Sequence, residues 1–163
     1  MPQPSSRTRD IGFAALALGA VAVTSLLGQF ATYPAIASWY AGLTKPSFNP
    51  PNWIFAPVWT TLYVLMAFAA WRILRLPSDT RGRGAALAAF FAQLVSNAAW
   101  SWMFFGANST LLGLINIVPQ LALIVVTIVL FRRLDRIAAW CLVPLACWVA
   151  YATLLNASLW WLN

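Results

Sequence analysis

The side chains of this sequence that could do chemistry are aromatic rings and uncharged amides. Ten of the 163 residues are Trp, and the chain contains neither His nor Glu. Without imidazoles or paired carboxylates, ordinary acid–base catalysis, a tetrahedral zinc site and histidine ligation of a haem are excluded. No metal site is therefore predicted, and the indole rings indicate a surface on which a flat apolar molecule could stack.

Helical spacing gathers the aromatic side chains into stripes. Phe55, Trp59 and Tyr63 recur every four residues, so they share one face of a helix. Trp148 and Ala152 are likewise one helical turn apart near the end of the chain. Tryptophans at the ends of apolar segments are typical of the membrane–water interface, but Trp59 and Trp148 lie further inside. These two rings are the first candidates for the wall of a pocket.

Amide side chains form a second set of stripes. Gln93, Asn97 and Ser101 lie on one helical face, and Asn116 and Gln120 are one turn apart on another segment. Uncharged polar groups at membrane depth need partners, either across a helix bundle or at a ligand. Interhelical hydrogen bonds alone would explain any one pair. Amides on two segments and aromatic rings on two others fit a ligand pocket somewhat better.

The elements that must position these residues are membrane helices. The chain is 62% hydrophobic and 8% charged, with a mean hydropathy of +0.77, which a soluble core of this size could not hide. An all-α bundle of five transmembrane helices, forming one membrane domain over residues 1–163, is predicted. The apolar runs that would form these helices cover roughly residues 11–31, 53–74, 85–105, 111–131 and 137–162.

The positive charges predict how the helices are oriented. Nine of the ten Lys and Arg residues precede the first run or lie in or beside the second and fourth connections, and only Lys45 lies on the other side. The positive-inside rule then places the N-terminus in the cytoplasm and the C-terminus outside. The net charge of +7 does not indicate nucleic-acid binding, because the cations flank hydrophobic runs instead of forming a patch with exposed aromatic residues.

A strip of small residues follows another face of the third run. Gly84, Ala88, Ala92 and Ser96 recur every fourth residue. Such a strip lets two helix backbones approach closely, which favours a homodimer through this face. Packing within one protomer is equally compatible with the spacing.

Three segments carry a resemblance to a known family. The runs WYAGLTKPSFNPPNWIFAPVWTTLYVLM, QLVSNAAWSWMFFG and VPLACWVAYATLLN resemble the first loop with the second helix, the third helix and the fifth helix of the TspO/MBR family. The resemblance implies a five-helix bundle, usually homodimeric, with a hydrophobic pocket beneath the first loop. It implies a porphyrin-like ligand, such as protoporphyrin IX or a related tetrapyrrole, with no required cofactor and membrane lipid as the surroundings.

The family's motifs map onto particular residues of this chain. The resemblance places Tyr40 in the first loop and Trp59, Asn97, Trp148 and Ala152 on the pocket walls. It also links Trp59 and Trp148 to light-dependent porphyrin breakdown, which makes them the candidate catalytic residues. A sensing, sequestering or transporting porphyrin binder is the leading hypothesis, and a photochemical enzyme and a passive facilitator are the alternatives. The Tyr–Lys/Arg cholesterol pattern of animal members cannot occur on the fifth helix, because no Lys or Arg follows Arg136.

The first connection, residues 32–52, is interpreted as a lid over this pocket. Its segment KPSFNPPNW contains three prolines, each of which fixes φ and removes a backbone donor, so the loop should hold its shape. A stiff lid loses little entropy when a ligand arrives. Lys45 within it is expected to meet a propionate of the ligand. A plain structural hairpin is the alternative.

Overall fold

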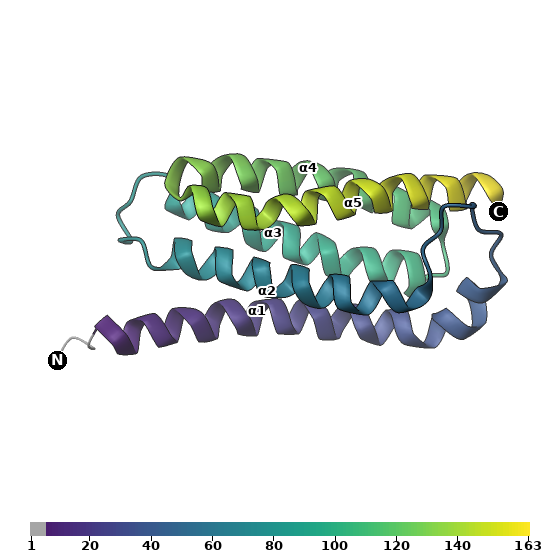
Figure 1. The fold of residues 1–163 in the computed structure, drawn as a ribbon, viewed down its shortest axis with the longest axis horizontal. Coiled ribbons are helices and arrows are strands. Elements are labelled where there is room, and N and C mark those ends of the chain that lie inside the picture. Colours follow the sequence, from purple (N-terminus) through teal and green to yellow (C-terminus); the bar gives the residue numbers. More distant parts are fainter. Residues whose placement is uncertain (1–5) are drawn as a thin grey trace.

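The computed structural model describes residues 6–163, in which five long helices run side by side (Figure 1). Short helical turns flank them: two π-helical turns, η1 (Ile36–Tyr40) and η3 (Trp102–Gly106), and a 3₁₀ turn, η2 (Asn52–Ile54). The described residues contain no strand, and the predicted all-α class is confirmed. The long helices are α1 (Ser6–Ala35), α2 (Phe55–Leu74), α3 (Arg83–Ser101), α4 (Thr110–Leu134) and α5 (Arg136–Leu162).

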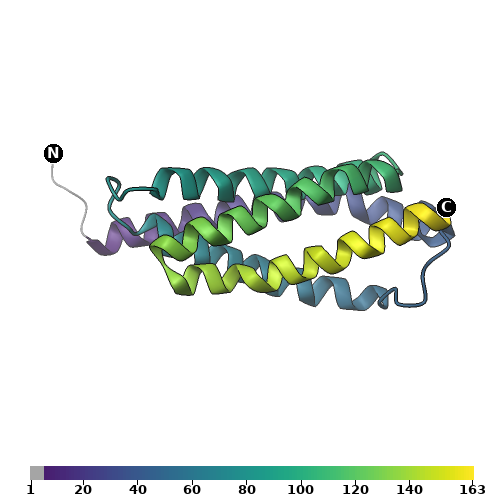
Figure 2. The same cartoon turned by 90° about the horizontal axis from the view of Figure 1, so that it is seen from above.

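The helices close into a ring. α1 packs against α2 and α3, α2 packs against α5, and α4 lies between α3 and α5. The start of α1 and the end of α5 lie at opposite ends of the bundle, as five antiparallel passes require (Figures 1 and 2). A ring of five helices leaves room for a cavity along its axis.

The outside of the bundle is apolar, as expected where lipid is the solvent. Phe30, Val95 and Leu154 are 72%, 70% and 66% exposed. Four helical segments are long and apolar enough to cross a membrane: residues 7–40, α2, α4 and α5. The fifth helix, α3, carries the polar residues Gln93, Asn97 and Ser101, which lower its hydropathy, yet it runs alongside the others (Figure 1). The chain is therefore an integral membrane protein.

The first helix and the first loop differ from their predicted bounds. α1 begins at Ser6 and continues through η1 as far as residue 42, so the loop covers only residues 43–51, hereafter loop 1. The predicted loop, 32–52, was too long, because the helical path continues past Pro34, which lies inside α1, and through η1. One proline in a long membrane helix can be accommodated when neighbouring groups satisfy the freed carbonyl. Tyr40 consequently lies on a helical turn and not in the loop.

The half of the bundle away from loop 1 is solidly packed. Phe90 and Phe131 stack with ring centroids 5.8 Å apart and an interplanar angle of 22°, and both are fully buried. Met66, Ile73 and Ile124 are also fully buried in this core. Because lipid is as apolar as these side chains, their packing stabilises the bundle through van der Waals contacts and not through removal from water. This half holds the ring of helices together, so the other half can remain hollow.

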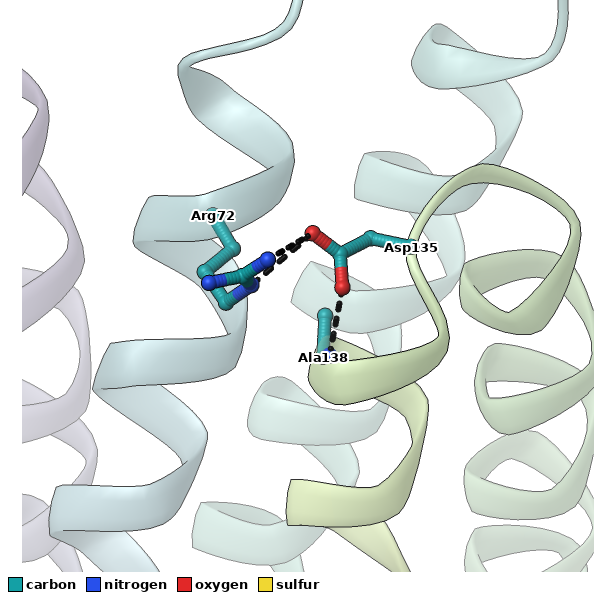
Figure 3. Close-up of polar contacts among 3 residues, drawn as sticks. All are labelled: Arg72, Asp135 and Ala138. Carbon is teal, nitrogen blue, oxygen red and sulfur yellow. Dashed lines mark hydrogen bonds and ion pairs between the residues drawn. The ribbon is translucent and has the colours of Figure 1, made fainter.

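An ion pair fixes the helices at the cytoplasmic end predicted above (Figure 3). Arg72 of α2 donates from Nε and Nη2 to Oδ2 of Asp135, at 2.8 and 2.7 Å. The other carboxylate oxygen, Oδ1, accepts the N–H of Ala138 at 3.0 Å and so caps α5. Burial acts to raise the pKa of the Asp135 carboxyl, but these hydrogen bonds and the Arg72 charge outweigh it and hold the pKa below its ordinary value. One carboxylate thus joins α2 to the turn between α4 and α5.

Candidate ligand-binding site

A cavity of about 440 Å³ lies inside the bundle beneath loop 1. All five long helices and the turns η1, η2 and η3 contribute lining residues. The side chains that line it are neutral throughout: the lining contains no Asp, Glu, Lys or Arg. Such a site favours an apolar ligand, because an unpaired charge buried in it would be costly. We call it the central cavity.

Aromatic rings from α2 and α5 form two of its walls. Trp59 and Tyr63 lie one turn apart on α2, with ring centroids 5.4 Å apart. Trp148 of α5 meets Phe55 of α2 edge to face, at 5.8 Å and 75°. All four line the central cavity, as does Ala152, one turn beyond Trp148. The predicted aromatic stripes thus face one shared space, whereas their part in ligand binding stays a prediction.

Amides and hydroxyls gather at one region of the cavity wall. The Tyr63 hydroxyl donates to Oδ1 of Asn97 at 3.3 Å. The indole N–H of Trp100 donates to Oδ1 of Asn156 at 3.2 Å, and the Asn156 amide donates to the Thr110 carbonyl at 2.7 Å. These bonds satisfy groups at membrane depth that would otherwise cost free energy. The predicted site residue Asn97 is therefore held by an interhelical hydrogen bond and also lines the cavity.

Gln120 of α4 also lines the cavity, with different hydrogen bonding. It is 2% exposed, and its amide makes no hydrogen bond to any residue among those the structure describes. A buried amide of this kind needs a polar partner. Gln120 is thus a buried polar group of this cavity that a ligand could satisfy.

The sequence stripes did not reveal the contribution of α1. Ser25, Gly28, Gln29 and Thr32 line the cavity from one face of α1, with Ile36 one turn further on. These small and polar residues recur every three or four positions in an otherwise apolar helix, and this spacing could have indicated a functional face. Gly28 is needed there because an added Cβ would lie 3.1 Å from the Ser101 hydroxyl of α3.

The cavity reaches the outside between α1 and α2. Five of its lining residues are exposed: Gln29 and Tyr33 on α1, Asn52 in η2, and Ala56 and Thr60 on α2. The Gln29 amide donates to the Ser25 hydroxyl at 2.9 Å. This opening is more polar than the lipid-facing surface around it, which suits an amphiphilic molecule.

Loop 1 is tied down at several points. The Tyr40 hydroxyl donates to Oδ1 of Asn49 at 3.0 Å, and the Tyr151 hydroxyl of α5 donates to the Phe48 carbonyl at 2.7 Å. The Asn163 side chain pairs with the backbone of Thr44, accepting its N–H at 2.8 Å and donating to its carbonyl at 3.0 Å. Tyr40 is buried and lines the cavity below the loop. These bonds hold loop 1 over the end of the cavity.

Lys45 does not line the central cavity. Its ammonium donates to the carbonyls of Tyr40, Ala41 and Leu43, at 2.8, 3.3 and 3.2 Å, and lies 4.8 Å from the centre of the Tyr40 ring. A cation at the C-terminal end of a helix satisfies carbonyls that have no partner in the helix. The ammonium therefore caps the helix in this structure, and its expected contact with a ligand propionate stays a prediction.

Gln93 also lies away from the cavity. It is 1% exposed in the core between α2 and α3, and its amide contacts the Met66 sulfur at 3.7 Å. Its Oε1 has no hydrogen-bond partner among the described residues. Gln93 and Asn97 share a helical face in the sequence, but one turn is enough to separate the packed core from the hollow half.

The small residues of α3 lie largely outside the bundle. Gly84, Ala88 and Ala92 are exposed, and no atom lies within 4 Å of a Cβ added to Gly84. Ser96 is half-buried and donates to Oδ1 of Asn116 on α4, at 3.4 Å. Packing within the protomer therefore uses Ser96 and leaves the other three residues of the strip uncovered.

Comparison with known proteins points to one family. The profile of the TspO/MBR family matches residues 14–162. The chain is 39% identical to the tryptophan-rich protein TspO of Chlorobaculum tepidum over 150 residues, which cover 91% of this chain and 94% of that one. It is 34% identical to the translocator protein of Sus scrofa, with 88% of each chain covered. It is 39% identical to the tryptophan-rich sensory protein of Cereibacter sphaeroides, with 72% of each covered.

Proposed function

The chain belongs to the TspO/MBR family, and from this we propose that its central cavity binds a porphyrin or a related tetrapyrrole such as protoporphyrin IX. The observation that carries the proposal is the pair of indoles, Trp59 and Trp148, which line one neutral cavity from two helices. A planar π system stacks on such rings, and each stacking contact with a base is worth about 1–3 kcal/mol. No cofactor is needed for binding of this kind.

The neutral lining predicts how such a ligand is oriented. A propionate buried among uncharged side chains would be left unpaired, at a cost of several kcal/mol. The apolar edge of the macrocycle should therefore enter first, with the propionates at the opening between α1 and α2. Gln29, Tyr33 and Thr60 line the cavity there and are exposed, so they could hydrogen-bond the acids beside the headgroups. Gln120 would reach the pyrrole edge from the opposite wall.

We propose a sensing, sequestering or transfer role for this binding. The Cereibacter sphaeroides relative is named a sensory protein, and the Sus scrofa relative is named a translocator protein. These names describe the relatives and motivate the proposal for this chain. Ion-coupled transport usually depends on an acidic or basic side chain within the membrane, and the described cavity lining contains no Asp, Glu, His, Lys or Arg. The opening between α1 and α2 supports passive lateral movement as the second candidate. Product analysis of protoporphyrin with the purified protein, in light and in dark, tests the remaining alternative, a photochemical enzyme.

We also propose a homodimer through α3, with the N-terminus in the cytoplasm. The exposed strip of Gly84, Ala88 and Ala92 would let a second copy approach closely. The orientation rests on the nine Arg residues at one end of the chain's membrane passes. Accessibility of cysteines introduced at Arg81 and Thr44, at the two ends, would test the orientation in sealed vesicles.

The binding proposal is tested by titrating the purified protein with protoporphyrin IX and following Trp fluorescence. Saturable quenching is expected. Trp59→Ala and Trp148→Ala should each weaken binding by about 1–3 kcal/mol, or roughly 5- to 150-fold in Kd. The control is Trp140→Ala, which removes an indole that is 71% exposed near the other end of α5. Wild-type affinity in both single variants and in the double variant would refute this cavity as the site.

A further inference from the structure

A second hollow lies on the outside of the bundle, between α2 and α5. It is lined by residues between Pro57 and Leu62 on α2 and between Pro144 and Tyr151 on α5, with Pro50 and Ile54 at its loop-1 end. We call it the α2–α5 groove. Pro57, Thr61, Pro144 and Cys147 are exposed along it, so it faces whatever surrounds the protein.

The two hydroxyls of this groove are already satisfied. The Thr61 hydroxyl donates to the Pro57 carbonyl of its own helix at 2.9 Å, and the Tyr151 hydroxyl donates to the Phe48 carbonyl at 2.7 Å. The three prolines have no N–H, and none of the lining residues is charged. A polar occupant would find almost no partner there. The groove suits hydrocarbon.

The groove also lies at membrane depth. α2 has 20 residues and is roughly 30 Å long at 1.5 Å per residue, about the thickness of the hydrocarbon core. Arg72 marks its cytoplasmic end, so residues 57–62 lie in the outer half of the bilayer. The groove follows α5 over seven residue steps, roughly 10 Å, in the direction in which lipid chains run. Lipid hydrocarbon is therefore what covers it.

Trp148 connects this groove with the central cavity. Among the described residues, it is the one that lines both hollows. Its ring is held between Phe55, at 5.8 Å, and Tyr151, at 5.7 Å. We propose that the α2–α5 groove is a binding site for one acyl chain of a membrane lipid, and that Trp148 is the common wall between this chain and the central cavity. A chain in the groove supports the indole from outside, so the two sites are coupled and the coupling is reciprocal.

Photocrosslinking tests this proposal without any cavity ligand. The purified protein in detergent micelles is titrated with a phosphatidylcholine that carries a diazirine in its acyl chain, and labelled residues are mapped by mass spectrometry. Label at residues 57–62 and 144–151 should saturate and be displaced by unlabelled phosphatidylcholine. Label near Val64 and Leu154, which are 61% and 66% exposed beside the groove, should rise linearly without displacement. Equal, unsaturable labelling everywhere would mean boundary lipid only and would overturn the site.

Two variants sharpen the test. Thr61→Trp fills the groove and loses only a hydrogen bond within its own helix, so saturable labelling should disappear, whereas the matched Val64→Trp should keep it. Trp148→Ala removes the common wall and should raise the half-saturating lipid concentration roughly tenfold, because the indole supplies much of the apolar contact. An unchanged half-saturation would refute the shared wall. Failure of porphyrin binding would leave these crosslinking outcomes intact, so the two proposals can fail separately.

Discussion

Replacing Lys45 by Met tests whether this residue caps a helix or binds the ligand. Met keeps the apolar part of the side chain and removes the ammonium that donates to the carbonyls of Tyr40, Ala41 and Leu43. If the ammonium is a cap, the variant should be less stable, and its preference among ligands should not depend on their charge. If it binds a propionate, the ligand preference should change while stability is kept.

The magnitude follows from the contacts of the ammonium. A cation at a helix C-terminus contributes about 0.3–1 kcal/mol. Its position 4.8 Å from the centre of the Tyr40 ring adds about 0.5–1 kcal/mol as a cation–π contact. The sum, about 1–2 kcal/mol, corresponds to a fall in Tm of roughly 2–8 °C for a chain of this length.

The assay compares two ligands that differ only in charge. Thermal unfolding is measured in detergent without ligand, and the affinities for protoporphyrin IX and for its dimethyl ester are then measured by Trp quenching. We expect a lower Tm and an equal change in the two affinities. A variant with wild-type Tm that binds the diacid more weakly, yet binds the ester normally, would refute the helix-cap assignment.

Three further outcomes are expected. The pKa of the Asp135 carboxyl is lowered in the folded protein, so its ion pair stabilises the fold fully above the ordinary carboxyl pKa. This stabilisation is lost as the pH falls through the lowered pKa. The Tm difference between wild type and Asp135→Asn should therefore shrink below about pH 4. Gly113→Ala places a Cβ 2.6 Å from the ring of a buried Phe and should lower stability by about 1–3 kcal/mol in thermal unfolding, whereas Gly12→Ala, in open space, should not. Ala92→Leu should weaken dimerisation measured by single-molecule photobleaching in bilayers, and Val64→Leu on the exposed face of α2 should leave it intact. A dimer indifferent to both changes would rule out this interface.

The sequence was sufficient for those features that depend on local chemistry. The apolar composition required lipid as solvent, and helical periodicity placed Phe55, Trp59 and Tyr63 on one face of α2. These features depend on the apolar surroundings and on the helical period of 3.6 residues, and both act on each segment independently of the rest of the chain. The all-α class and the five helices were predictable for that reason. The ends of the helices were less predictable, because α1 continues through Pro34 within the packed bundle.

Only the tertiary structure decided which faces meet and which groups are already used. Gln93 and Asn97 are equivalent by periodicity, yet one lies in the packed core and the other lines the cavity, because the ring of helices is solid at one end and hollow at the other. Lys45 bends back onto the carbonyls at the end of its own helix, a choice that its position in a loop does not reveal. Trp148 lines both hollows because its ring lies between Phe55 of α2 and Tyr151 of α5, on the boundary between the two spaces. Such contacts join residues from helices far apart in the chain, and spacing along one helix carries no information about them.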